Sequence, residues 1–379
     1  MSRKQKLQSM LEKEKIMKKR ALGILLAVCM TVGTLLGGCG SKEATAAQPS
    51  QAAQPSQAAS AESGSAPAAP AEEFTQIEMR LSHHNAQNQP IHEAFEKWVS
   101  LVSEKTGGAV KISVFPAASL YNQEDALDAV KAGALEMALG DTSVISNIQP
   151  EYALFSYPFL LDSYEAAEKV ILGDIGRSVD EKFVADNGIR PLGWTWNGYR
   201  NICSNKPLTS MADCKGLKLR SPGADVYLNT FKTLGMAPQV ISWSEAYSAM
   251  QTGIVDGVES SLEAFYTQGF YKLGDNICLS HHMLSTIGPI INEDVWQSLN
   301  ENTQKVLLDA WAQCQADLNK TSIENDNKYL EALKEEGCNI TEFSDKDQIF
   351  NTFSEMWDTS ATEIGAKDIL DQIKETVKG

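Results

Sequence analysis

Two arginines, Arg200 and Arg220, have the chemistry needed to hold an organic acid. Between positions 198 and 220 the chain has five basic residues and one acidic residue, although the whole chain has a net charge of −16. A guanidinium presents a planar fork of N–H donors that matches the two oxygens of a carboxylate. The local charge therefore predicts a carboxylate-binding site. The residues alone leave a second interpretation of Arg220 open, a structural ion pair with an Asp or Glu.

Four other side chains are candidates for the same site. Trp243 opens a predicted helix and can cover the carbon chain of a ligand, or it can belong to the core. Asp141 ends a predicted strand and can accept hydrogen bonds from ligand hydroxyls, or it can cap the helix that follows. His84 and Asn85 end the first predicted strand. They can reach the same cleft, or they can lie in a solvated loop.

A repeated strand–helix–strand–helix–strand pattern positions these residues. One copy runs over residues 77–139 and the other over 217–258, with glycine after each helix as a stop signal. Asp141 lies eight residues after Gly133, as Ser261 lies eight after Gly253. We expect two lobes, each with a largely parallel sheet whose carboxyl ends face one shared cleft. Arg220 ends the first strand of the second copy.

Two segments are expected to cross between the lobes. Residues 193–200 alternate aromatic and polar side chains and predict a strand that is also a hinge candidate, and residues 285–291 predict a second crossing. A helix from about Thr303 to Glu336 would span roughly 50 Å and run along both lobes. The predicted class is therefore an α/β, two-lobe fold like that of periplasmic binding proteins. Its expected lobes are 74–197 with 286–325, and 198–285 with 326–379.

The N-terminus predicts export and a lipid anchor. Residues 17–20 are basic, residues 21–36 are apolar, and Leu36-Gly37-Gly38-Cys39 has the form of a lipobox. A single membrane-spanning helix is the alternative, but about 16 apolar residues are short for one. We therefore expect a signal peptide over 1–38 and lipid modification of Cys39. Residues 39–73 are rich in Ala, Gln, Ser and Pro and predict a flexible tether.

Charge and cysteine content exclude several classes of function. The chain carries 33 basic and 49 acidic side chains, and the first 38 residues hold 8 and 2 of them, which leaves 25 against 47. So acidic a protein lacks the basic surface that a nucleic-acid-binding protein needs. Five cysteines follow the lipobox without a CxxC or Cys/His cluster, so we expect neither a disulfide framework nor a metal site. No catalytic motif is present, and we expect a binding protein without a cofactor.

The globular part, from Glu78 to about Lys367, resembles the DctP-type solute receptors of tripartite ATP-independent periplasmic (TRAP) transporters. The resemblance is carried by three segments: VFPAASLYNQEDALDAVKAGALEMAL, GYRNICSNKPLTSMADCKGLKLRSP and LGMAPQVISWSEAYSAMQTGIVDGVES. It implies a two-lobe fold that encloses its ligand between the lobes. It also implies delivery of that ligand to a membrane permease driven by an ion gradient.

The resemblance also assigns roles to residues. The family's carboxylate-binding arginine falls on Arg220, a second ligand-binding arginine on Arg200, and the aromatic cover on Trp243. An acidic contact of sialic-acid-binding members falls on Asp141. The family often has Asn where this chain has Ser260, which puts the second polar contact to the carboxylate in question.

Together these features predict a monomeric, lipid-anchored receptor on the outer face of the cytoplasmic membrane that passes a small organic acid to a TRAP permease. Sugar acids are favoured over four-carbon dicarboxylates, because Asp141 would repel a second carboxylate and accept hydroxyls. Val144 replaces an arginine of sialic-acid receptors, which argues against sialic acid. Two alternatives stay open: a receptor for a dicarboxylate, and a sensor of the same fold that reports ligand to a signalling partner. An enzyme acting on an organic acid ranks third.

Overall fold

The computed structural model describes residues 73–378, so the predicted signal peptide, Cys39 and nearly all of the tether lie outside the described residues. Both copies of the predicted repeat are present. The first copy comprises β1 (Ile77–Ser82), α2 (Pro90–Lys105), β2 (Val110–Phe115), α3 (Gln123–Lys131) and β3 (Met137–Asp141). The second copy comprises β6 (Lys218–Ser221), α7 (Asp225–Thr233), β7 (Ala237–Val240), α8 (Trp243–Gln251) and β8 (Gly257–Ser260).

The third strand of each copy begins two or three residues later than the pattern predicts. After α3, the chain turns at Gly133 with φ +69°, and the amides of Ala134 and Leu135 donate to the carbonyl of Ala129. The second copy closes α8 in the same way at Gly253, with φ +75°. The residues expected to start the strand therefore still donate their backbone N–H groups to carbonyls in the last turn of the preceding helix.

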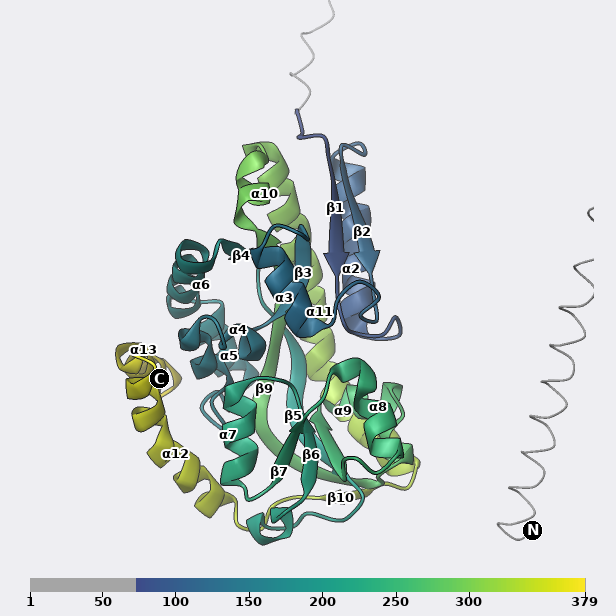
Figure 1. Cartoon of the computed structure of the whole chain (residues 1–379), viewed down its shortest axis with the longest axis vertical. Coiled ribbons are helices and arrows are strands. Elements are labelled where there is room, and N and C mark those ends of the chain that lie inside the picture. Colours follow the sequence, from purple (N-terminus) through teal and green to yellow (C-terminus); the bar gives the residue numbers. More distant parts are fainter. Residues whose placement is uncertain (1–72, 379) are drawn as a thin grey trace, which may run out of the picture. The chain divides into compact units, whose positions relative to one another are not determined.

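The two copies form the two ends of one ten-stranded sheet (Figure 1). The strand order β2-β1-β3-β9-β5-β8-β6-β7 places the first strand of each copy between its second and third. Pairing is parallel within each copy. We call β1–β3 with their helices the first lobe and β6–β8 with theirs the second lobe. The largely parallel sheet predicted for each lobe is confirmed, and the two sheets are continuous.

Two long antiparallel strands join the lobes, as the sequence predicts. These are β5 (Thr195–Ser204) and β9 (Asn276–Asn292); the short strands β4 (Ile189–Pro191) and β10 (Asn339–Thr341) also pair with β9. Asp141 at the end of β3 pairs with Ile287 of β9, and Ser260 at the end of β8 pairs with Asn201 of β5. Both copies therefore direct the carboxyl ends of their strands toward the middle of the sheet.

The crossing strand β5 is irregular where it passes between the lobes. Its pairing with β9 shifts register between Trp196 and Tyr199, and again between Arg200 and Ile202. Gly198 lies in the first shift with φ +85°, and a Cβ there would approach Asp326 Oδ1 and Ser261 Cβ at 3.2 Å. A bulge at a point where only glycine fits gives the crossing a local bend.

A single long helix spans both lobes. Helix α11 (Glu301–Glu335) has 35 residues, so it extends about 52 Å. It packs on α2 in the first lobe and on α9 (Leu262–Thr267) in the second. Between them, Trp311 Nε1 donates to the carbonyl of Gly193 at 3.1 Å. The prediction of a helix along both lobes is confirmed.

The remaining helices lie between the strands along the chain, and two of them form its C-terminal part. They are α4 (Thr142–Ile145), η1 (Pro150–Ser156), α5 (Tyr164–Ile171), α6 (Asp174–Asn187), η2 (Met211–Cys214), η3 (Phe270–Lys272), α10 (Glu293–Ser298), α12 (Lys346–Glu363) and α13 (Lys367–Lys378). Helix α13 packs on α5 and α6, and Trp357 of α12 donates to the carbonyl of Pro158 at 3.1 Å. Within residues 73–378, no helix combines the length and apolarity that a membrane crossing requires.

Candidate ligand-binding site

A cavity between the lobes is lined by all seven site residues that the sequence predicts. Its lining comprises His84, Asn85, Gln89, Gln123, Asp141, Asn197, Arg200, Arg220, Pro222, Trp243, Ser260, Ser285 and Ile287. The first five come from the segment between β1 and α2, from the start of α3 and from the end of β3. The others come from the crossing strands, from the ends of β6 and β8, and from the start of α8. We call this cavity the interlobe cleft.

Arg220 presents the free end of its guanidinium to the cleft. The side chain is 2 % exposed, and its Nε donates to the carbonyl of Ile241 at 2.8 Å. Nη1 lies 3.9 Å from Glu259 Oε1, beyond hydrogen-bond distance, and within the described residues neither Nη1 nor Nη2 has a hydrogen-bond acceptor. Burial, together with the charge of Arg200, lowers the pKa of Arg220 to about 10, so the guanidinium stays charged at neutral pH.

Arg200 is held by a carboxylate that the sequence analysis did not select. Its Nε and Nη2 form a two-point ion pair with Glu259, with 2.7 Å between Nη2 and Oε1, and its Nη1 donates to Ser285 Oγ at 3.2 Å. The guanidinium also lies 5.0 Å from the ring centre of Tyr227. Burial opposes the charge of Arg200, but the attraction of Glu259 outweighs it and raises the pKa of Arg200. The structural ion pair considered for Arg220 thus forms mainly at Arg200.

Glu259 is fully buried and serves both arginines. It lies on β8, beside β5, which carries Arg200. Burial alone would raise the pKa of Glu259, yet the charge of Arg200 and the nearby His282 lower it, so the carboxylate is ionised. His282 Nε2 lies 3.7 Å from Glu259 Oε2. One buried carboxylate therefore faces two guanidinium groups: it is hydrogen-bonded to Arg200 and lies 3.9 Å from Nη1 of Arg220.

Across the cleft, the wall of the first lobe offers an acidic acceptor. Asp141 Oδ1 accepts from the amide of Ser143 at 2.9 Å and from its hydroxyl at 2.5 Å, and Oδ2 accepts from Gln123 Nε2 at 3.1 Å. Asp141 therefore caps α4 and lines the cleft at once, and its contact with a ligand stays a prediction. A carboxylate has about four acceptor positions, and three are used here. One position on Oδ2 is left for a ligand donor.

His84 and Asn85 complete this wall with neutral polar groups. Burial, followed by the charges of His83, Arg220 and Arg200, lowers the pKa of His84 to about 3, so the imidazole is neutral. Asn85 is buried, and its Nδ2 donates to Gln89 Oε1 at 3.0 Å. Its Oδ1 has no hydrogen-bond partner within the described residues. A buried amide oxygen without a partner is suited to accept from a ligand hydroxyl.

Trp243 and Ser260 complete the wall of the second lobe. The guanidinium of Arg220 lies 5.2 Å from the ring centre of Trp243, which also packs on Phe270 at 5.5 Å. The indole therefore holds the arginine in place and forms part of the cleft surface. Ser260 is 2 % exposed and supplies a short hydroxyl where a longer amide side chain would reach further into the cleft.

Several lining residues escaped the sequence analysis. They are Gln89, Gln123, Asn197, Pro222, Ser285 and Ile287, together with Glu259 behind the lining. Pro222 lies two residues after Arg220, and that short separation was the available signal for it. Gln123 opens α3 and reaches Asp141 only through the fold, since the two are 18 positions apart in the sequence. Ser285 depends on the register between β5 and β9, which a single sequence does not reveal. The described residues contain no group of three or more His, Cys, Asp or Glu that can hold a metal ion.

The interlobe cleft is nearly closed in this structure. Its volume is about 30 Å³, which is small beside the cavities that usually hold small-molecule ligands.

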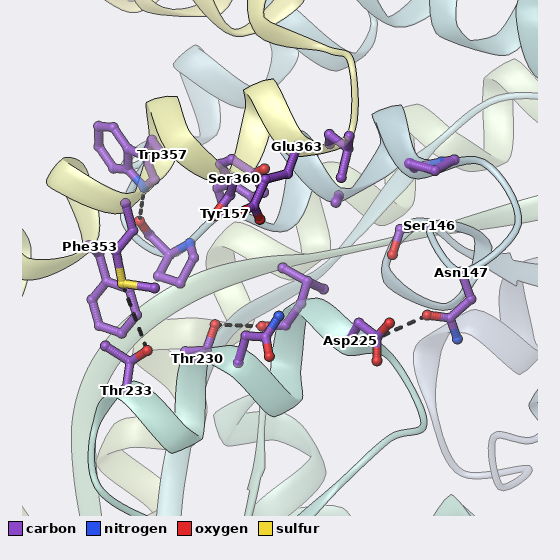
Figure 2. Close-up of a pocket in the computed structure, with 17 residues that line it drawn as sticks. Ser146, Asn147, Tyr157, Asp225, Thr230, Thr233, Phe353, Trp357, Ser360 and Glu363 are labelled. Atoms are coloured by element: carbon purple, nitrogen blue, oxygen red, sulfur yellow. Dashed lines mark hydrogen bonds between the residues drawn. The ribbon is translucent and has the colours of Figure 1, made fainter.

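A larger cavity of about 280 Å³ lies between α7 and α12. Figure 2 shows Phe353, Trp357 and Ser360 of α12 across from Thr230 and Thr233 of α7. Its lining includes two acidic side chains and no Arg, Lys or His. This cavity therefore cannot clamp a carboxylate, and the interlobe cleft is the candidate site despite its smaller volume.

Known proteins share both the sequence and the fold. Residues 81–367 match the family described as bacterial extracellular solute-binding protein, family 7 (DctP). A C4-dicarboxylate-binding protein of Bacillus subtilis is 30 % identical over 72 % of this chain and 78 % of its own length. A sugar-acid-binding protein of Advenella mimigardefordensis, solved with galactonate, is 26 % identical, with a TM-score of 0.76 over 80 % of this chain and all of its own. A TRAP solute-binding protein of Sulfurospirillum deleyianum, solved with succinate, is 26 % identical, with a TM-score of 0.73 over 79 % of this chain and 99 % of its own. The chain therefore belongs to the DctP family, the extracellular solute-binding proteins of TRAP transporters.

Proposed function

We propose that this protein is an extracytoplasmic receptor for a sugar acid with a single carboxylate, which it delivers to a TRAP permease. The observation that carries the proposal is the distribution of charge across the interlobe cleft. One arginine with a free guanidinium end, Arg220, faces an aspartate with a free acceptor position, Asp141. A carboxylate at one end of the ligand and hydroxyls at the other satisfy both groups.

The carboxylate is bound by the second lobe. Arg220 donates through Nη1 and Nη2, and Arg200 contributes the part of its guanidinium that faces Ser285. Each charge-assisted hydrogen bond is worth about 1.5–3 kcal/mol. Ser260 adds a hydroxyl close to the carboxylate, and Trp243 covers the carbon chain.

The hydroxyls of the ligand are bound by the first lobe. Asp141 Oδ2 and Asn85 Oδ1 accept hydrogen bonds, and His84 is neutral, so it serves as a hydrogen-bond donor or acceptor without adding charge. Each lobe then holds part of the ligand, and the closed arrangement binds it better than the open one. A permease can recognise the loaded receptor by this shape.

Charge selects against a second carboxylate. Arg200 is neutralised by Glu259, so a dicarboxylate would place its second charge near Asp141 without a cation to balance it. Two like charges 4 Å apart near a protein surface repel by about 4 kcal/mol. The galactonate bound by one similar structure fits this arrangement. The dicarboxylate name of the Bacillus subtilis relative keeps a four-carbon diacid as the second candidate.

Anchoring places the receptor at the membrane. Lipid modification of Cys39 would tether the lobes to the outer face of the cytoplasmic membrane through residues 39–73. The receptor would then act as a monomer beside its permease. Mass spectrometry of the purified membrane-bound protein tests the anchor, because an unmodified Cys39 would rule it out.

Calorimetry with a panel of acids tests the ligand class. Galactonate, glucuronate and gluconate should bind the mature protein more tightly than succinate and malate by at least tenfold. Tighter binding of the diacids would overturn the monocarboxylate assignment and establish the second candidate. Conversion of any bound acid to another compound would indicate an enzyme.

A further inference from the structure

Two asparagines connect the lobes outside the lining of the interlobe cleft. Asn147 follows α4 in the first lobe, and its Nδ2 donates to the carbonyl of Gly223 at 2.6 Å. Its Oδ1 accepts from the amide of Asp225 at 3.3 Å, at the start of α7 in the second lobe (Figure 2). One side-chain amide thus makes two hydrogen bonds with the backbone of the other lobe.

Asn88 makes a similar connection. It lies between β1 and α2 in the first lobe, and its Nδ2 donates to the carbonyl of Thr267 in α9 at 3.2 Å. Its Oδ1 accepts from Gln268 Nε2 at 3.3 Å. Again a single amide gives and receives a hydrogen bond across the lobes. We call the contacts of Asn147 and Asn88 the two clasps.

Each clasp is linked along the chain to residues that line the cleft. Asn147 follows Asp141 by six residues, and α4 lies between them. Its partner Gly223 is three residues beyond Arg220 and directly follows the lining residue Pro222. Asn88 lies between Asn85 and Gln89, which both line the cleft. Neither clasp asparagine lines the cleft itself, so neither is a ligand contact.

The exposure of the clasps makes them reversible. Asn88 and Asn147 are both exposed to solvent. When the lobes separate, water replaces the lost partners, so no buried polar group is left unsatisfied. Each clasp therefore stabilises the closed arrangement slightly. When a clasp opens, the fold of each lobe is unaffected.

We propose that Asn88 and Asn147 are positioning residues that set the equilibrium between the open and closed arrangements of the lobes. The proposal deepens the proposed function, because it assigns part of the ligand affinity to residues that do not touch the ligand. In this structure both clasps are formed while Arg220 and Asp141 line the same cleft. They raise affinity by slowing ligand release, since release requires both clasps to open.

The experiment measures the distance between the lobes and the rate of ligand release. Nitroxide labels at Lys105→Cys on α2 and Lys232→Cys on α7, both exposed, report the distance by pulsed electron paramagnetic resonance without ligand. Cys338→Ser removes the described cysteine that is not buried. Stopped-flow fluorescence with galactonate, using the unlabelled protein, reports association and release through the change in tryptophan emission, to which Trp243 in the cleft lining contributes.

The test variants are Asn88→Ala and Asn147→Ala, and Asn229→Ala is the matched control. Asn229 is an exposed asparagine on α7 that lines the larger cavity without bridging the lobes. Each clasp variant should shift the distances toward the open arrangement and speed galactonate release about tenfold, with little change in association. The control should change neither quantity.

The two readouts separate this proposal from the proposed function. Unchanged distances and release rates in both clasp variants would overturn the clasp assignment. An equal effect of Asn229→Ala would also overturn it, because the effect would then follow from surface change alone. If the wild type does not bind galactonate, the proposed ligand class fails while the distance measurement still decides the role of the clasps.

Discussion

Removal of the charge on Glu259 is expected to destabilise the second lobe strongly. In Glu259→Gln, Arg200 loses the two-point partner that holds it, including the 2.7 Å contact between Nη2 and Oε1. Arg200 is 6 % exposed and Glu259 is fully buried, so solvent cannot replace the lost charge. Breaking a buried pair by removing one partner costs about 3–5 kcal/mol. That loss is a large fraction of the stability of a typical domain.

Denaturant unfolding, followed by circular dichroism, measures this cost. The double variant Arg200→Met/Glu259→Gln is the control, because it removes both charges and should recover much of the lost stability. A loss below 1 kcal/mol in Glu259→Gln would refute the reasoning. It would mean that water reaches Arg200. The assumption that Glu259 neutralises Arg200 and leaves Arg220 as the cation for the ligand carboxylate would then be wrong.

Three further predictions concern binding and pH. Arg220→Ala should lose two charged hydrogen bonds to the ligand, a cost of about 3–6 kcal/mol that weakens galactonate binding at least about 100-fold in calorimetry; unchanged affinity would contradict the carboxylate assignment. Asp141→Asn should narrow the preference for galactonate over succinate, because repulsion of the second carboxylate is removed; an unchanged ratio of dissociation constants would show that Asp141 does not select. Burial raises the pKa of Glu263 from 4.5 to about 7, so the stability that this group contributes is full below about pH 4.5 and is lost as pH rises through 7. Between pH 4.5 and 8 the midpoint temperature of thermal unfolding should therefore fall less steeply with pH in Glu263→Gln than in the wild type. Parallel plots of midpoint temperature against pH for the two proteins would contradict this pKa.

The sequence allowed the fold to be predicted because the repeat is local. The glycines after the helices located both copies, and the alternation of aromatic and polar side chains located the first crossing strand, so each signal is read within a short stretch of sequence. The register between strands is not local. Whether Arg200 or Arg220 pairs with Glu259 depends on the alignment of β5 beside β8, which brings together residues 59 positions apart. Glu259 forms its hydrogen-bonded pair with Arg200 and lies 3.9 Å from Arg220 Nη1, a division between the two arginines that the sequence does not show.

The sequence predicted which residues line the cleft better than it predicted the hydrogen bonds between them. Asp141 was expected either to cap a helix or to face the ligand. The structure shows the cap and places the residue in the cleft lining, because the end of β3 is also the start of α4, while the ligand contact stays a prediction. Gln123 and Ser285 reach the cleft through packing of elements distant in the chain. No pattern in the sequence shows how close two loops of opposite lobes lie, so Asn88 and Asn147 were not selected.

A crystal structure of the mature protein with galactonate tests the central claim most directly. We expect the ligand carboxylate between the lobes, with its oxygens 2.7–2.9 Å from Nη1 and Nη2 of Arg220, and a ligand hydroxyl that donates to Asp141 Oδ2. Galactonate in the cavity between α7 and α12, or a carboxylate turned toward Asp141, would contradict the account.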